Sequence, residues 1–557
     1  MTALEHPGER GAVTPDYLVV TAASPALGAP TEPVLEMSDI QGIAIPGFFK
    51  PHQTLIYIRL PDNPGVVGQF RRFLAGFVVS TAAETLADRR LFRRSSEDSP
   101  ERARSDELVL AAIGFTYQGL LKLTPGAFYI PSEAFRHGLP VRSELLGDPR
   151  DPSDEGHPIK WVVGARGSEL DVLIVVAGSR RGRVSERAGA IVRALSNLGV
   201  EVGSEEGDVR EDAKGHEHFG FDDGVSQPGI RGLASSTERD WISDRTIDPA
   251  EVPATWLYGD PGQDLVWPGE FVLGYPSTSP DPLLPGPIAS PTPTWTRNGS
   301  FLVYRRLRQD VGLFWRTMRS EAERLATLPG FEEMTDDRLA ARLVGRWRSG
   351  APVNRVPDSD LKALGDDNLA NNNFRFDSDT PIFKLVGGKI DRFPAAKADP
   401  AGVTCPWAAH IRKVNVRDSS SDVGARSATL ERRILRVGVP FGKSLTDRYA
   451  ETADDPQTGQ RGLLFLSIQS SIEEQFEFLQ SRWMNDDSRP KMPGGNDMLV
   501  GQNAATRDGV RRCSIFGKAL AQAEVRATKQ WVIPTGGGYF FLPSVSALQA
   551  VLAVTST

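Results

Sequence analysis

Two uninterrupted apolar runs, residues 108–115 and 172–177, constrain the fold of this chain most strongly. Runs of this kind are typical of strands that are buried on both faces of a sheet. A further strand is predicted over residues 54–60, and apolar positions at helical spacing predict helices over 66–79 and 184–198. Strands and helices in this order predict an α+β domain in which helices pack on a sheet.

A similar order of elements returns in the second half of the chain. Strands are predicted over 301–305, 434–439 and 463–468, and helices over 311–318 and 472–483. Between the halves, residues 253–293 hold ten prolines, which is expected of a long connector or of an ordered wall over a pocket. We therefore expect a loosely held arm over residues 1–37, a domain over 38–250, a proline-rich connector over 251–297 and a second domain over 298–557.

The composition of the chain excludes several classes of partner. Its 71 acidic and 64 basic residues give a formal net charge of -7, whereas a nucleic-acid-binding protein would be expected to carry a basic excess. No stretch approaches the roughly 18 apolar residues that span a membrane, so we expect no membrane partner. Cys405 and Cys513 are the only cysteines, which favours a reducing, cytoplasmic location.

The segment 220–228 combines features that point to chemistry. It places Asp222 and Asp223 between glycines, shortly after His216 and His218, with neither helical nor strand periodicity. Glycine allows sharp turns and close approach of another group, so a carboxylate held there can reach a small ligand and move protons. The structural alternative is a loop whose acids cap a helix or form an Asx turn.

Three segments in order resemble the motifs of the dye-decolorizing peroxidases, a family of haem enzymes. Residues 219–229 resemble the family's GxxDG signature, residues 405–413 its haem-ligand segment, and residues 433–442 its distal-arginine strand. The resemblance covers nearly the whole chain after about residue 38. It implies an α+β fold of two ferredoxin-like domains, each an antiparallel sheet with packed helices, with haem held mainly by the C-terminal domain.

The resemblance also assigns roles to individual residues. His410 matches the iron ligand, and the small residues Ala408 and Ala409 before it would let a flat macrocycle lie close to the backbone. Asp223 matches the distal acid and Arg436 the distal arginine, whose fixed charge suits a developing anion. Asp222 is assigned a structural role.

Two further residues are expected near the cofactor. Arg417 occupies the family's usual arginine position and is expected to bind a haem propionate, although Val416 stands where the family more often has proline. The iron ligand should also donate its second ring N–H to a carboxylate. Glu473 and Glu474 are the candidates, and each also fits a capping box with a serine three residues earlier. We favour Glu473.

The activity implied by the resemblance is that of a peroxidase with one haem b per chain. It would reduce hydrogen peroxide to water through a ferryl intermediate and oxidise small aromatic or bulky dye-like one-electron donors. A non-catalytic haem carrier or haem iron-release protein on the same fold is the alternative. A second alternative is a non-haem iron site built from His216, His218 and an aspartate. The oligomeric state stays open.

Overall fold

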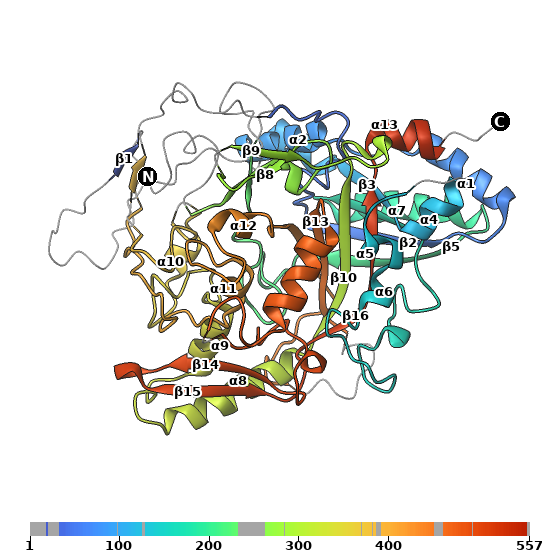
Figure 1. Ribbon diagram of the computed structural model, residues 1–557. Helices are drawn as coiled ribbons and strands as arrows, with labels where there is room; N and C mark the ends of the chain where they lie inside the picture. The colour runs from blue at the N-terminus through green and yellow to red at the C-terminus, as the bar shows by residue number, and fades with distance from the viewer. Residues whose placement is uncertain are drawn as a thin grey trace.

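The fold is seen in a computed structural model, shown as a ribbon in Figure 1. The structure describes residues 18–20, 33–96, 98–124, 129–231, 262–282, 284–368, 370–380, 383–385, 391–450, 460–492 and 494–553. Most of the predicted N-terminal arm, residues 1–17 and 21–32, lies outside these ranges, as does the stretch 232–261. None of the helices in the described ranges is long and apolar enough to cross a membrane.

In the described part of the first half, four antiparallel strands lie side by side with helices between them. These strands are β2 (His52–Arg59), β3 (Val109–Phe115), β4 (Val172–Gly178) and β5 (Glu201–Asp208), and they lie side by side in the order β3-β4-β2-β5. Helix α1 (Pro64–Gly76) follows β2, and α7 (Arg181–Ser196) follows β4. Two strand-helix-strand units arranged in this way make a ferredoxin-like domain.

The second half repeats this arrangement. Strand β10 (Ser300–Gln309) is followed by α8 (Val311–Ala326), and β12 (Leu435–Phe441), β13 (Gly462–Gln469) and β16 (Val532–Leu542) complete the order β12-β13-β10-β16. In both halves the sheet order is therefore second, third, first and fourth strand. Strands β16 and β3 pair antiparallel at Phe541 and Phe115, so the two ferredoxin-like units share one sheet of eight strands. The predicted α+β fold class is confirmed.

The sheet curves until its two outer strands meet. A side chain at Gly207 on β5 would collide with Val439 on β12, since a Cβ there would lie 2.5 Å from a methyl group of Val439. Alternate residues of β2, β3 and β4 consequently enter two separate cores. Ile56 and Ile174 belong to the core that also contains the buried residues of α1 and α7, whereas Leu55 and Leu173 belong to the core on the opposite face. Both apolar runs are thus buried on two sides, as predicted.

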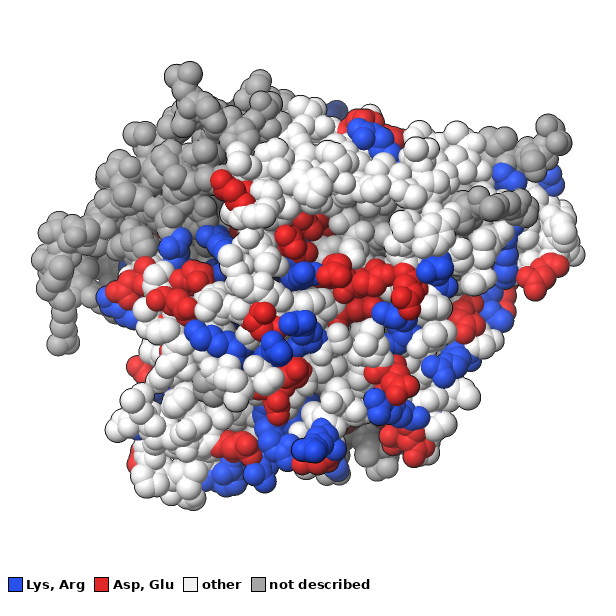
Figure 2. Space-filling model, in the orientation of Figure 1, with Lys and Arg blue, Asp and Glu red and all other residues white. Residues whose placement is uncertain are grey.

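The second half carries long additions that build one end of the molecule. They include α9 (Asp336–Val344), α10 (Lys362–Gly365), α11 (His410–Val414) and α12 (Arg426–Leu430), and the hairpin of β14 (Arg511–Phe516) and β15 (Gln522–Ala527). Figure 1 shows this hairpin beside α8 at the lower end of the view. On the face shown in Figure 2, acidic and basic residues are interspersed rather than gathered by sign.

Several predicted elements differ in detail from the observed ones. The predicted helix over 311–318 extends to Ala326, and the helix predicted over 472–483 consists of two π-helical segments, η6 (Ile472–Glu477) and η7 (Leu479–Met484). The described part of the proline-rich stretch contains β7 (Leu265–Val266), η4 (Pro268–Glu270), β8 (Pro276–Thr278) and β9 (Pro285–Ile288). Trp267 and Phe271 are buried there, so this part is packed on the body of the protein.

Candidate active site

Four of the five predicted site residues line one cavity. The cavity has a volume of about 250 Å³, slightly below the usual range for small-molecule and cofactor sites, and His410, Asp223, Arg436 and Arg417 all border it. Its walls are otherwise mainly apolar, with contributions from Phe221, Val344, Ile411, Leu463, Phe465 and Leu499. The fold thus brings together residues that stand more than 200 positions apart in the sequence.

His410 begins the short helix α11 directly after the fully buried Ala408 and Ala409. Its Nδ1 lies 2.7 Å from Oδ2 of Asp497, and the other oxygen of Asp497 accepts hydrogen bonds from the backbone amides of Leu499 and Val500. Burial alone would raise the pKa of Asp497. The charge and hydrogen bond of His410 and the two amides outweigh burial and hold that pKa below its usual value.

The prediction that Glu473 is the carboxylate partner of His410 is wrong. Its Oε1 accepts hydrogen bonds from the backbone amide of Ala134 (2.8 Å) and the hydroxyl of Ser132 (2.9 Å), at the start of helix α5 (Glu133–His137). Glu473 therefore helps to cap another helix and does not line the cavity. Asp497 was missed because it lies 87 residues beyond His410 in a segment with no periodic pattern, so only the fold reveals the pair.

Asp223 lies at the end of a tight turn. Its amide donates to the carbonyl of Gly215 (2.9 Å), and its Oδ1 accepts from the amide of Gly224 (2.7 Å). The same oxygen lies 3.5 Å from Nη1 of Arg436, whose Nη2 donates to the carbonyl of Ser226 (3.0 Å). An acid and a fixed cation thus border the cavity as neighbours.

Arg436 is held through its backbone as well. It lies on β12, where Gln227 donates from Nε2 to the carbonyl of Arg436 (2.7 Å) and accepts the amide of Arg436 at Oε1 (3.1 Å). Because Gln227 follows the turn that carries Asp223, one side chain links the backbone positions of the acid and the arginine.

Two acidic residues that were not given a chemical role also border the cavity. Burial, with a smaller contribution from the charge of Asp223, raises the pKa of Asp222 to about 6, while His216 and Arg346 act in the opposite direction. Glu217 is the other residue, and enclosure of its carboxyl raises its pKa as well. Asp222 belongs to the GxxDG segment but was assigned a structural role, and no sequence motif singled out Glu217.

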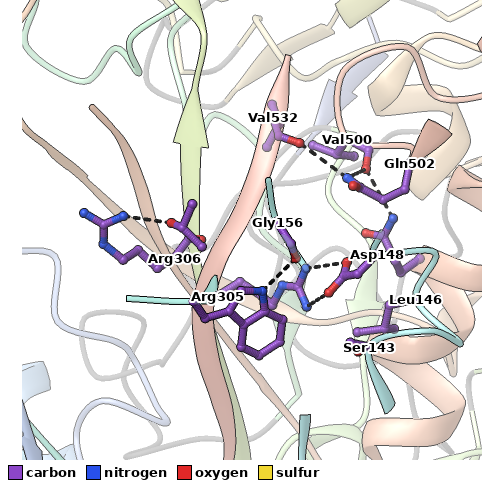
Figure 3. Close-up of polar contacts among 12 residues, drawn as sticks. Ser143, Leu146, Asp148, Gly156, Arg305, Arg306, Val500, Gln502 and Val532 are labelled. Carbon is purple, nitrogen blue, oxygen red and sulfur yellow. Dashed lines mark hydrogen bonds and ion pairs between the residues drawn. The ribbon is translucent and has the colours of Figure 1, made fainter. Parts of the chain in front are cut away.

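Five arginines border the cavity, but not all are equally placed to bind an anion. Arg305 is paired with Asp148 (Figure 3), and the two Nη–Oδ distances are 3.0 and 2.8 Å. The neighbouring Gln502 donates to the carbonyl of Val500. Arg417 donates to the carbonyls of Gly262 (3.0 Å) and Phe374 (2.9 Å), and its guanidinium stacks on the ring of Phe374. The pairing with Asp148 therefore makes Arg305 a structural residue rather than a candidate ligand for an anion.

The residues present fit a haem. Nδ1 of His410 faces Asp497, which leaves Nε2 as the nitrogen available to a metal. The cavity walls are mainly apolar, as a macrocycle requires. The guanidinium of Arg433 also borders the cavity and is mostly buried, with Nε 3.4 Å from a carboxylate oxygen of Asp264. Its positive charge beside the cavity suits a carboxylate such as a propionate.

The alternative non-haem iron site receives no support. His216 contacts the carbonyl of Gly220 through Nδ1 (2.9 Å), and His218 contacts the carbonyl of Phe441 through Nε2 (2.8 Å). Burial lowers the pKa of His218 to about 4. Within the part of the chain that the structure describes, no three histidine, cysteine, aspartate or glutamate side chains gather as metal ligands would.

Comparison with known proteins identifies the family of the chain. Residues 39–211 match the family model of the DyP dimeric alpha+beta barrel domain. A dye-decolorizing peroxidase of Mycena epipterygia is 31% identical, covering 93% of this chain and 87% of its own length, and the multifunctional dye peroxidase DyP2 of an Amycolatopsis species is 31% identical, covering 79% and 81%. The structure of an ancestral D-type dye decolorizing peroxidase superposes with a TM-score of 0.71 at 30% identity, over 94% of this chain and 100% of that one. The chain belongs to the dye-decolorizing peroxidase family and is a peroxidase-type oxidoreductase.

Proposed function

We propose that this protein binds one haem b per chain through His410 and reduces hydrogen peroxide to water at the expense of aromatic one-electron donors. One observation carries the proposal: a single cavity is bordered by the His410 ring that pairs with Asp497 and by the Asp223 carboxylate that neighbours Arg436. Dye-type substrates are supported by the relatives of Mycena and Amycolatopsis, which are a dye-decolorizing peroxidase and a dye peroxidase. A phenolic donor is supported by a dye-decolorizing peroxidase, 25% identical with a TM-score of 0.68, that was solved with 2,6-dimethoxyphenol.

Each residue has a defined task in this reaction. A bound haem would supply the redox chemistry, since its iron can take up a peroxide oxygen and accept the oxidising equivalents released when the O–O bond breaks. Asp223 takes the proton from one peroxide oxygen and delivers it to the other, which leaves as water. Arg436 stabilises the negative charge on that leaving oxygen. Two donors then supply two electrons and two protons, which yields the second water.

The remaining residues act on the cofactor. Asp497 fixes the tautomer of His410 and raises its basicity, which favours higher oxidation states of a bound metal. Arg417 is proposed to bind a propionate, in keeping with its position at the cavity wall. Its guanidinium already donates hydrogen bonds to the carbonyls of Gly262 and Phe374. The attraction between its positive charge and the propionate would therefore add to any new hydrogen bond.

The test compares haem-loaded Asp223→Asn and Arg436→Leu proteins with the wild type. Mixing each with peroxide in a stopped-flow spectrometer should show a slower change of the haem band, by roughly 10²–10⁴-fold for the acid and 10²–10³-fold for the arginine. Asp62→Asn, at a side chain that is 92% exposed, is the matched control and should react at the wild-type rate. Wild-type rates in both active-site variants would contradict the assigned roles. A wild-type haem band that does not respond to peroxide would instead indicate a haem carrier.

A further inference from the structure

Glu217 borders the same cavity as Asp223, yet the reaction above gives it no task. The residue keeps some exposed surface, but the surrounding turn encloses its carboxyl group. An enclosed carboxylate is costly unless hydrogen-bond donors satisfy its oxygens. The donors that surround Glu217 therefore show which part of the structure its carboxylate holds in place.

Two of these donors are backbone amides of the turn that leads to Asp223. The amide of Phe219 donates to Oε2 of Glu217 and the amide of Phe221 to Oε1, each at 2.8 Å. The amide of Glu217 itself donates to the carbonyl of Phe221 at 3.0 Å. Gln309 at the end of β10 donates from Nε2 to Oε2 of the same carboxylate. One side chain thus fastens two alternate residues of the turn and connects them to the sheet.

Helix α8 fixes the other side of the same turn. Trp315 donates from its indole nitrogen to the carbonyl of Phe219 (3.1 Å), and its ring stacks on Phe221. The ring of Phe219 packs on Phe314 with centroids 4.4 Å apart. The backbone of the turn is consequently clamped between aromatic side chains and the carboxylate, and Asp223 follows two residues after Phe221.

We infer that Glu217 is a positioning residue for Asp223, because it holds the turn in the conformation that keeps the Asp223 carboxylate beside Arg436. The inference rests on the proposed role of Asp223. Alanine at position 217 would leave two enclosed amides without acceptors, and the turn would have to rearrange to satisfy them. Glutamine would offer one acceptor oxygen and one amide group, which cannot serve two N–H donors and the donor from Gln309 at once.

The experiment measures how fast cyanide binds to the ferric haem of the loaded protein. Neutral hydrogen cyanide must pass its proton to a base in the site when it binds, so this rate reports the proton acceptor without turnover. Glu217→Gln should slow binding by about tenfold to a hundredfold, and Asp223→Asn by at least as much. Glu270→Gln is the matched control, since this buried carboxylate accepts the amide of Thr278 and does not border the cavity. It should bind cyanide within about twofold of the wild type.

Steady-state kinetics separate positioning from general damage. In Glu217→Gln, kcat/KM for peroxide should fall with the cyanide rate, whereas kcat/KM for 2,6-dimethoxyphenol should stay within about twofold. Equal losses for both substrates would overturn the inference. So would wild-type cyanide binding in Glu217→Gln together with slow binding in Asp223→Asn, a result that preserves the role of Asp223. Wild-type binding in Asp223→Asn would refute the proposed reaction itself. If Glu217→Ala does not retain haem, the inference is tested with Glu217→Gln alone.

Discussion

Nδ1 of His410 lies 2.7 Å from Oδ2 of Asp497, whose side chain has no exposed surface. The carboxylate is satisfied on its other oxygen by two backbone amides, so its orientation toward the imidazole is fixed. A buried anion in this position favours a ring that donates from Nδ1 and presents Nε2 to a metal. The proximal side of the proposed haem site is thus set by two residues whose pairing depends on the tertiary fold.

Asp497→Asn should weaken haem binding by roughly 10- to 100-fold, as the loss of a hydrogen-bonding partner of a metal ligand commonly does. The reduction potential of the haem should rise, because a neutral amide no longer stabilises the more positive oxidation state. Transfer of haem to an acceptor protein measures the first effect and spectroelectrochemical titration the second. An unchanged potential together with unchanged haem transfer would show that the Asp497 contact does not influence the cofactor.

Glu473→Ala provides the contrasting case. Its carboxylate accepts from Ser132 and Ala134 at the start of α5, so its removal should lower stability by about 1–2 kcal/mol. The haem spectrum and reduction potential should stay as in the wild type. Thermal unfolding and the titration used for Asp497→Asn test this pair of expectations. A shifted potential would mean that Glu473 acts on the cofactor after all.

Much of the fold can be predicted from the sequence, because a strand that is buried on both faces is apolar at nearly every position. The apolar runs became β3 and β4, and helical spacing predicted α1 and α7. Strand β16 was not predicted, since Pro534 and the glycines after it are poor strand residues. Its neighbours β10 and β3 provide the pairing that its own sequence does not signal.

The site divides in the same way. His410, Asp223 and Arg436 belong to short motifs that can be read in isolation, whereas Asp497 and Glu217 act through contacts that no local spacing encodes. The capping box predicted near Glu473 forms only in part, because the amide of Ser471 donates to Gln475 and not to a glutamate three residues later. Ser471 accepts the amide of Glu474, and Glu473 serves a different helix.

Gln227→Leu should loosen Arg436 on strand β12. The amide and carbonyl of Arg436 would both lose their side-chain partner, at a cost of about 1–2 kcal/mol in stability for partly buried groups. The reaction with peroxide should slow several-fold while haem content is retained, because His410 is untouched. Gln227→Glu keeps an acceptor for the amide but no donor for the carbonyl, so it should fall between leucine and the wild type. The same ordering is expected in thermal unfolding and in stopped-flow rates, and equal behaviour of all three proteins would contradict the link.

Asp222→Asn should change how stability depends on pH. The pKa of Asp222 is raised from 3.8 to about 6, so the folded protein binds this proton more tightly than the unfolded chain does. Its stabilising contribution is therefore present below about pH 4 and is lost as the pH rises through about 6. Two pKa units correspond to about 3 kcal/mol, which partial exposure of the carboxyl reduces to about 1–2 kcal/mol.

Because asparagine does not titrate, the variant should gain stability relative to the wild type between pH 4 and pH 7. Thermal unfolding of the haem-loaded proteins at both pH values measures this gain, with Asp62→Asn as the exposed control. A difference between variant and wild type that is constant with pH would show that Asp222 titrates as an ordinary surface carboxylate.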